Sequence, residues 1–254
     1  MTTAAHEGHT TRRHGRAGLL QTDAEWQRRN EVLFDQLRAL IERFATFELG
    51  RGLDVGCQTG DLTDLLATKV GHSWWGIDPA LEAATQAPHG APLLPGTAHA
   101  LPFDDGYFDC LVFANVFEHI EPADYSRSFR EMYRVLRPGG VIVGQIPNPH
   151  FPIESHSRLP FMGWLPPAVQ RRYWRLSPVS WPLDFYSVTI RDLDRVARSA
   201  GLPLEFKRNF NYPLDVVPRA VRPLARMMQL PMRVVPWSWQ FVLRRPTTST
   251  SSIG

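Results

Sequence analysis

The residues best suited to chemistry form a glycine-bearing turn, LDVGCQTG (residues 53–60), which begins with a short apolar run. Glycine adopts backbone angles that other residues avoid, and it lets a ligand approach the main chain closely. The residues that follow predict a helix, whose first N–H groups and positive dipole end favour polar or anionic groups. The turn alone is a weak signal, because several nucleotide-binding folds use one.

A single acidic residue makes the prediction more specific. Asp78 ends the second predicted strand, within the run GIDPA (76–80), about 20 residues after the turn. A carboxylate at that place accepts hydrogen bonds from both hydroxyl groups of a ribose, so turn and acid together fit an adenosyl cofactor. An NAD-dependent dehydrogenase is the nearest rival. Its G-x-G-x-x-G turn needs three glycines, and this turn supplies only Gly56 and Gly60.

The elements that must position these residues alternate between helices and short strands. Apolar residues at helical spacing predict a helix from Thr22 to Phe44, and further helices are expected at 61–68, 124–136 and 189–200. Buried strands are predicted at 53–55, 73–77, 108–114, 141–146, 204–210 and 238–243. This alternation favours a Rossmann-like α/β fold, in which a mostly parallel sheet carries helices on both faces.

Two long segments, 148–187 and 211–236, interrupt the alternation and are rich in Pro, Trp and Arg. Loops of this length in a compact domain are usually lids or binding loops. We expect them to be accessory segments after the strands at 141–146 and 204–210. These are the fifth and sixth strands of the seven-stranded sheet that the resemblance described next implies. Residues 1–20 and 247–254 are expected to be disordered tails, so that one domain runs from 21 to 246.

Four motifs, in this order and spacing, resemble those of the class I S-adenosylmethionine-dependent methyltransferases, of the group typified by small-molecule and ubiquinone- or sterol-pathway enzymes. They are LDVGCQTG (53–60), GIDPA (76–80), HALPFDDGYFDCLVFANVFEHI (99–120) and LRPGGVIVGQIPN (136–148). The stretch YSVTIRDLDRVARSAGL (186–202) extends the match. The resemblance implies a seven-stranded sheet, S-adenosyl-L-methionine as the cofactor, and methyl transfer as the reaction.

Position by position, the resemblance implies a set of cofactor-binding residues. The turn, with Asp54, Gly56, Cys57 and Gly60, would face the methionine half of the cofactor, and Asp78 would hold the ribose. Thr97, Ala98 and His99 would border the adenine, and Asn115 would line the pocket. Two positions depart from the family pattern: Gln58 replaces a glycine, and Thr97 replaces an acid that often reads the adenine amino group.

Transfer to a hydroxyl acceptor requires a base with a pKa near neutrality, and histidine is the natural candidate. The first candidate is His156, in the accessory segment just after the fifth strand. The second is His119, which follows Glu118 at the end of the fourth strand. The alternative for each is a structural, hydrogen-bonded histidine.

The run Asn115-Val116-Phe117-Glu118-His119 also contains two metal-binding residue types. A hard divalent ion requires several oxygen ligands, and this run supplies one carboxylate and one amide. The sequence therefore predicts no metal site.

Positive charge is concentrated in the two accessory segments. Residues 150–182 and 213–245 carry net charges of +3 and +5, whereas residues 21–149 carry −8. Four arginines in the second segment recur at spacings that align on one helical face: Arg219, Arg222, Arg226 and Arg233. For residues 213–236, a cationic segment on a membrane surface and a lid packed on the domain both fit this pattern, although Pro223 and Pro231 oppose one continuous helix. Three tryptophans of the first segment either stack on an acceptor or pack: Trp164, Trp174 and Trp181.

The composition is that of a globular protein, with 43% hydrophobic and 21% charged residues. Two cysteines exclude a disulfide framework and suit a reducing cytoplasm. The basic N-terminus lacks the apolar core of a secretory signal, and no apolar run of 18 residues predicts a membrane span. We therefore expect a cytoplasmic protein, either free or peripheral at the inner face of the membrane.

The sequence thus predicts a methyltransferase for a small-molecule, natural-product or glycan/lipid-type acceptor. Oxygen is favoured as the methylated atom over nitrogen or carbon. The alternative is a catalytically silent member of the fold that serves as a binding or assembly module. A nucleic-acid partner is disfavoured, because no target-recognition module accompanies the basic segments.

Overall fold

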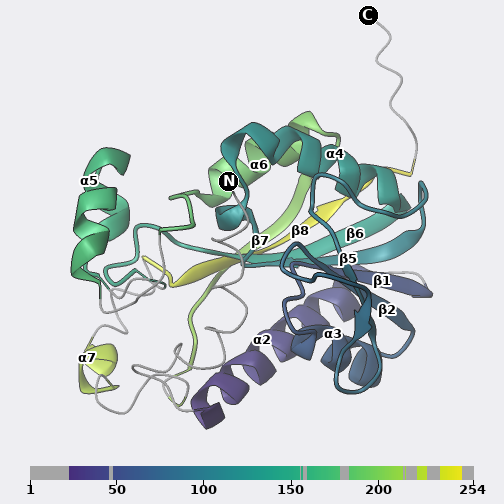
Figure 1. Ribbon diagram of the computed structural model, residues 1–254, viewed down its shortest axis with the longest axis horizontal. Helices are drawn as coiled ribbons and strands as arrows, with labels where there is room; N and C mark the ends of the chain where they lie inside the picture. Colours follow the sequence, from purple (N-terminus) through teal and green to yellow (C-terminus); the bar gives the residue numbers. More distant parts are fainter. Residues whose placement is uncertain are drawn as a thin grey trace, which may run out of the picture.

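The computed structural model describes residues 23–45, 48–154, 156, 159–177, 183–213, 215, 222–227 and 235–247. A central sheet runs through the molecule, with helices on both of its faces (Figure 1). The expected tail at 1–20 and nearly all of that at 247–254 lie outside the described residues, as do Trp181, Arg219 and Arg233.

Within the described ranges, eight strands form the sheet, in the order β3-β4-β2-β1-β5-β6-β8-β7. Their bounds are β1 Arg51–Val55, β2 Ser73–Asp78, β3 Thr85–Gln86, β4 Pro92–Pro95, β5 Phe108–Ala114, β6 Leu136–Pro147, β7 Leu204–Phe210 and β8 Ser238–Arg244. From β4 to β6 every neighbouring pair is parallel, whereas β8 runs antiparallel to both β6 and β7. The carboxyl ends of β1, β2, β4, β5 and β6 therefore meet at one edge of the sheet.

Helices cover both faces of the sheet. The longer ones are α2 Asp23–Phe44, α4 Tyr125–Val135 and α6 Ile190–Ser199, and the shorter ones are α3 Asp61–Leu65, α5 Pro167–Tyr173 and α7 Arg222–Met227. In Figure 1, α4 and α6 lie above the sheet and α2 and α3 lie below it. Short helical turns lie at Leu66–Val70, Phe117–His119, Pro122–Asp124, Met162–Trp164 and Trp174–Leu176.

The alternation of side chains along each strand explains why both faces of the sheet are covered, and β5 is the clearest case. Leu111 and Phe113 pack with α4 and α6 in one cluster, and Cys110 and Val112 pack with α2 in another. Successive side chains of a strand point to opposite faces, so a strand of continuous apolar residues is buried on both sides. The predicted α/β fold with a mostly parallel sheet is confirmed.

The sheet has one strand more than the seven expected. The addition is the two-residue edge strand β3, which pairs antiparallel with β4. No residue pattern indicated β4 itself, because its four residues begin and end with proline, and proline is atypical of a strand interior.

The connection between α4 and β6 also differs from the prediction. The sequence predicts a helix to residue 136 and a strand at 141–146, with Pro138, Gly139 and Gly140 between them. The helix ends earlier, at Val135, and the strand begins at once with Leu136, which pairs with Phe108 of β5. The pairing partner, which is far away in sequence, sets this boundary.

The first accessory segment contains helical structure where the sequence indicated only a long loop. Its two helical stretches, 162–164 and 167–176, are held by a small cluster of Leu159, Met162, Trp174 and Phe185. Trp174 is thus a packing residue, whereas Trp164 is exposed. In Figure 1, α5 projects from the body of the molecule, at the left of the view.

Of the second accessory segment, the only helix among the described residues is α7. Arg222 and Arg226 lie on it, and Pro223 occupies its first turn, where proline is tolerated. None of the helices in the described ranges is long and apolar enough to cross a bilayer.

Candidate functional site

The glycine turn after β1 adopts the backbone angles that its sequence predicts. Gly56 and Gly60 have φ angles of +82° and +85°. Gln58, which stands where the family has glycine, also lies in the left-handed region, with φ +54°. Non-glycine residues adopt this region at a cost. The geometry therefore explains why a glycine is usual at position 58.

Both glycines are also required by packing. A Cβ atom on Gly56 would lie 2.4 Å from Cγ2 of Val116, and one on Gly60 would lie 2.7 Å from the Cβ of Ala87. The turn is fixed to the end of β2, because the N–H groups of Gly56 and Cys57 both donate to the carbonyl of Ile77. The turn is therefore a close-packed backbone cradle.

Asp78 stands at the carboxyl end of β2 beside this turn. Its carboxylate accepts hydrogen bonds from the N–H of Gln58 at 2.8 Å and from the N–H of Ala80 at 2.9 Å. Its carbonyl accepts from the N–H of Gly96 at 3.2 Å, which brings the segment with Thr97, Ala98 and His99 next to it. The acid and the predicted adenine-side residues thus lie together.

Asp54 and Cys57 are buried within the turn. The Asp54 carboxylate accepts a hydrogen bond of 2.8 Å from the hydroxyl of Thr63 in α3. Burial and the nearby Asp78 charge raise the pKa of Asp54 to about 7, although the Thr63 bond opposes the shift. Burial is also the main reason why the pKa of the Cys57 thiol is far above its usual value. Cys57 is therefore a packing group and not a nucleophile.

Asn115 follows β5 and adopts a left-handed conformation, with φ +57°. Its N–H donates to the carbonyl of Gln145 at 2.7 Å, and its side-chain oxygen accepts from Nε2 of Gln145 at 3.3 Å. The next residue, Val116, packs on Gly56. All the predicted cofactor-binding residues thus gather at the carboxyl ends of β1, β2, β4 and β5. A cradle bordered by a fixed carboxylate fits an adenosyl cofactor.

The two predicted catalytic histidines come together, although they lie on different segments. Their rings are 5.2 Å apart and nearly perpendicular. Nδ1 of His119 lies 3.0 Å from the carbonyl oxygen of Asp184, and Nδ1 of His156 lies 2.8 Å from Oε1 of Glu154. The ring of His156 also stacks on Phe185, at 4.5 Å between centroids.

The charges around His156 determine its protonation. Burial lowers the pKa of His156, but the negative charges of Glu154, Glu118 and Asp184 outweigh burial, so that the pKa is raised. Glu118 is 1% exposed and Glu154 is 6% exposed. Two buried carboxylates therefore lie close to this imidazole.

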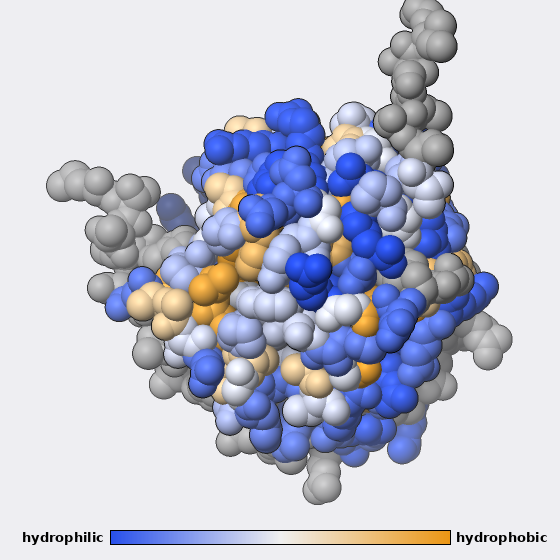
Figure 2. Space-filling model, turned by 90° about the vertical axis from the view of Figure 1, so that its right-hand side faces the viewer, coloured by the Kyte–Doolittle hydropathy of each residue, from blue (hydrophilic) through white to orange (hydrophobic). Residues whose placement is uncertain are grey.

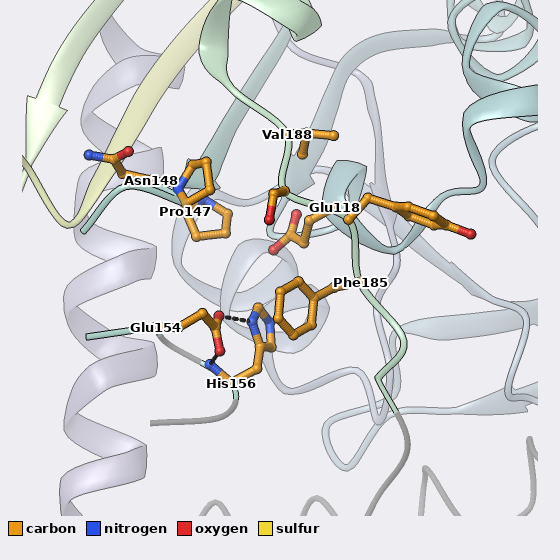
Figure 3. Close-up of a pocket in the computed structure, with 10 residues that line it drawn as sticks. Glu118, Pro147, Asn148, Glu154, His156, Phe185 and Val188 are labelled. Carbon is orange, nitrogen blue, oxygen red and sulfur yellow. Dashed lines mark hydrogen bonds and ion pairs between the residues drawn. The ribbon is translucent and has the colours of Figure 1, made fainter. Parts of the chain in front are cut away.

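These residues line a pocket at the carboxyl ends of β5 and β6 (Figure 3). Glu118 comes from the turn after β5, Pro147 and Asn148 from the end of β6, and Phe185 and Val188 from the chain before α6. Figure 3 shows the Glu118 carboxylate above the His156 ring and the Glu154 carboxylate at its left. The pocket shares the edge of the sheet with the glycine turn.

Sequence reasoning missed Glu154 and Phe185 as site residues. Glu154 had one local signal, because it stands two residues before His156 and also accepts that residue's backbone N–H at 2.9 Å. Phe185 had none, since only the folded chain brings it onto the imidazole.

Comparison with known proteins bears on the family that the sequence motifs indicate. Residues 53–144 match the family model described as "Methyltransferase domain". The Hahella chejuensis ubiquinone/menaquinone biosynthesis C-methyltransferase is 31% identical over 166 residues, which are 56% of this chain and 66% of that protein. The chain belongs to the class I S-adenosylmethionine-dependent methyltransferases. The chain spans less than two thirds of the length of the first curated relatives that it matches, between 28% and 66%.

Solved structures show the same fold. An S-adenosylmethionine-dependent methyltransferase from Mesorhizobium loti superposes with a TM-score of 0.55 and 18% identity, over 83% of this chain and 96% of that one. The [4+2]-cyclase SpnF superposes with a TM-score of 0.53 and 18% identity, over 84% of this chain and 81% of that one. The methyltransferase thus shares its fold with a protein whose name describes another reaction.

Proposed function

We propose that this methyltransferase transfers the methyl group of S-adenosylmethionine to a small-molecule, natural-product or glycan/lipid-type acceptor bound in the pocket of Glu118 and His156. One observation carries the proposal. Val116 packs on Gly56 of the turn, and Glu118, two residues later, lines the pocket. The cofactor cradle and the pocket are therefore adjacent along one short stretch of chain.

When bound, S-adenosylmethionine supplies a methyl group that is already activated on a sulfonium. The chain must then position the acceptor and exclude water. The cradle and Asp78 hold one partner of the reaction, and the accessory segment closes the pocket over the other. Pro147, Pro149 and Phe185 give this pocket apolar walls beside the polar Glu118, Glu154 and His156.

The two histidines are the proposed acceptor-activating residues, His156 first and His119 second. The Glu154 carboxylate fixes the His156 ring through Nδ1, which leaves Nε2 as the atom that accepts a proton. Such activation favours oxygen as the methylated atom, because a hydroxyl must lose a proton. The name of the Hahella relative favours carbon as the second choice.

A second candidate function is a catalytically silent or differently acting fold member. The fold shared with a [4+2]-cyclase and the left-handed Gln58 in the cofactor turn favour it. A protein of this kind would hold a ligand in the pocket without methyl transfer.

The sequence suggests a membrane contact at 213–236, most of which lies outside the described residues, and we propose a peripheral membrane contact on the first accessory segment instead. The exposed large apolar side chains among the described residues all lie between 161 and 186: Phe161, Trp164, Val169, Leu176 and Tyr186. Arg171, Arg172 and Arg175 are exposed on the same segment. The face shown in Figure 2, on the side away from α5, is mainly hydrophilic.

Calorimetric titration with S-adenosylmethionine tests the proposed function. Charge-assisted hydrogen bonds are each worth roughly 1.5–3 kcal/mol, so Asp78→Ala should weaken binding at least about tenfold. Because Asp78 also accepts two backbone N–H groups, Asp78→Asn serves as the milder variant, and thermal melts report on the fold. Asp61→Ala, which removes an exposed carboxylate nearby, is the matched control.

Methyl transfer is then followed by mass spectrometry as a gain of one methyl group on candidate quinols, phenols and glycolipids. Tight binding that depends on Asp78, with methyl transfer to one class, supports the proposal. A parent protein that does not bind S-adenosylmethionine contradicts it and favours the silent module. Gly56→Val is unsuitable as a binding test, because the clash with Val116 would disturb folding.

A further inference from the structure

A row of buried polar side chains crosses the sheet on the face that α2 covers. Arg208 of β7, Gln240 of β8 and Gln145 of β6 are register partners in neighbouring strands. Gln145 is 2% exposed and Gln240 is 0% exposed, although the nearby Val143 and Val242 belong to the apolar cluster that packs on α2. Burial of an amide costs free energy unless the amide is hydrogen-bonded, so the bonds of this row decide what it does.

Hydrogen bonds join the row into one chain. Nε of Arg208 donates to Oε1 of Gln240 at 2.8 Å, and Nε2 of Gln240 donates to Oε1 of Gln145 at 3.3 Å. Nε2 of Gln145 then donates to two oxygen atoms, each at 3.3 Å: Oδ1 of Asn115 and the phenol oxygen of Tyr212. The chain thus runs from the edge strand β7 to the residue that follows β5.

Arg208 fixes the direction of this chain, because a guanidinium donates hydrogen bonds and cannot accept them. Gln240 therefore turns its oxygen toward Arg208 and its amino group toward Gln145, and Gln145 repeats this order. Asn115 and Tyr212 accept through their oxygen atoms, so Nδ2 of Asn115 and the O–H of Tyr212 remain as donors. Within the described part of the chain, neither group donates to another residue.

Both donors lie at the edge of the sheet that carries the predicted active site. Asn115 follows β5, and Tyr212 follows β7, which is parallel to β6 because both run antiparallel to β8. Both residues keep part of their surface exposed. Gln145 shares a face of β6 with Pro147, which lines the pocket. Because both oxygen atoms bond the same nitrogen of Gln145, the two donors belong to one small site.

The surroundings of the two donors favour an oxygen atom that carries negative charge. The guanidinium of Arg29 in α2 lies over the Tyr212 ring, 5.4 Å from its centroid. Hydrogen bonds to an ionised oxygen are roughly twice as strong as those between neutral groups. Donors that the fold already holds in place need no rearrangement when such an oxygen binds.

We propose that Asn115 and Tyr212 bind the ionised oxygen of a phenol- or enol-type acceptor, and that Gln145 is the residue that positions them. This inference rests on the proposed function, because it assigns one contact of the acceptor. Hydrogen bonds to the ionised form lower the pKa of an acidic group. The site therefore selects acceptors whose hydroxyl ionises near neutral pH over simple alcohols.

Binding of 4-nitrophenol tests the proposal without any need for activity. This phenol absorbs visible light in its ionised form only, so one titration reports both its affinity and its protonation. S-adenosylhomocysteine is present, because under the proposed function it fills the cofactor cradle. We expect the bound phenol to ionise at a lower pH than it does in water. Tyr212→Phe should weaken binding about tenfold and reduce this shift.

Gln145→Glu separates the donor role from a purely structural one. A carboxylate of the same size still accepts from Gln240, but it has no N–H and must also accept from Asn115 and Tyr212. The hydrogen bonds of the row are retained, whereas both donors now turn away from the ligand. We expect probe affinity to fall at least about tenfold, and thermal melts report on the fold.

Two matched controls accompany these variants. Gln36 of α2 accepts from Nη2 of Arg208 at 2.8 Å, so Gln36→Glu adds the same charge beyond the row and leaves its direction unchanged. Tyr107 also has a guanidinium over its ring, that of Arg51 at 4.2 Å, but it precedes β5 at the opposite edge of the sheet. Gln36→Glu and Tyr107→Phe should both bind 4-nitrophenol like the parent.

A parent that does not bind 4-nitrophenol overturns the proposal, as does unchanged binding in Tyr212→Phe and Gln145→Glu. Equal losses in the two controls would also contradict it. If Tyr212→Phe weakens S-adenosylmethionine instead of the phenol, the donors serve the cofactor and the proposal is wrong. Normal cofactor binding in these cases leaves the proposed function intact. Probe binding that depends on Tyr212, in a parent that does not bind S-adenosylmethionine, would refute methyl transfer and keep the phenolate site.

Discussion

Two carboxylates at the ends of neighbouring strands experience different surroundings. Asp78 accepts two backbone N–H groups, whereas Asp54 accepts one hydroxyl hydrogen bond in a nearly dry environment. Removal from water disfavours the charged form of a carboxyl group, and the pKa of Asp54 is therefore raised to about 7.

This shift predicts how stability depends on pH. Between about pH 4 and pH 7 the folded protein retains a proton on Asp54 that the unfolded chain has lost, so the contribution of Asp54 to stability falls as pH rises through that window. Asp54→Asn keeps the bond from Thr63 and removes the charge. Relative to the parent, this variant should gain on the order of a few kcal/mol between pH 5 and pH 8. Urea unfolding of the cofactor-free protein at both pH values measures it.

Asp64→Asn is the matched control. Asp64 is also buried, but its carboxylate accepts hydrogen bonds from the N–H groups of His89 and Ala91. If Asp54→Asn shows no pH-dependent difference from the parent, Asp54 is ionised in the fold. The interpretation of its environment would then be wrong.

At the same scale, the sequence predicts the cofactor side of the site better than the acceptor side. The turn, Asp78 and Asn115 each follow a strand, so parallel strands bring them together automatically. The contact of His156 with Glu154 and Phe185 depends on an accessory segment whose path no periodicity encodes. Both histidines could be named, but not the carboxylate behind His156.

Among the elements, α6 shows how a local signal fixes a boundary. Thr189, the first residue of the predicted helix 189–200, is its N-cap: the Thr189 hydroxyl accepts the N–H of Asp192, and the Asp192 carboxylate accepts the N–H of Thr189 in return. Such a capping box satisfies N–H groups that the first helical turn leaves open. The cap therefore fixes where α6 begins against α4.

Thr189→Ala should lower the free energy of unfolding by about 1 kcal/mol, because it removes this cap. Ser126→Ala, at an exposed position of α4, should change it by less than about 0.5 kcal/mol. Both changes in the free energy of unfolding are measured from the midpoints of denaturant unfolding, with the denaturant slope (m-value) equal in all variants. An equal effect of the two changes would contradict a stabilising role for the cap.

Local signals fail where a distant partner determines the structure. The strand β4 is bounded by prolines and depends on β2 beside it. Likewise, Leu136 is drawn into β6 by Phe108. Single-sequence patterns contain neither partner, so these boundaries could not be read from them.

For the whole molecule, the distribution of apolar and basic side chains predicts behaviour at membranes. The protein should float with vesicles that contain phosphatidylglycerol and should be released as salt rises, because charges at a surface are screened within about 8–10 Å. Trp164→Ser combined with Leu176→Ser should reduce flotation severalfold, since these side chains are 60% and 72% exposed.

Arg130→Glu, at an exposed position of α4 in the main body, is the control and should float like the parent. Loss of flotation with Arg222→Glu and Arg226→Glu alone would move the contact to α7. If the parent protein does not float with the vesicles, the membrane contact is refuted. The basic segments would then act as a lid packed on the domain.

The small cluster of Leu159, Met162, Trp174 and Phe185 is separate from the two clusters that hold the sheet. Mutations that repack it need not disturb the strands that carry the cofactor turn. Under the proposed function, the segment that borders the pocket can therefore change while the packing around the turn stays the same. If the proposed function holds, exchange of residues 149–187 between relatives should change acceptor choice and leave S-adenosylmethionine binding unchanged.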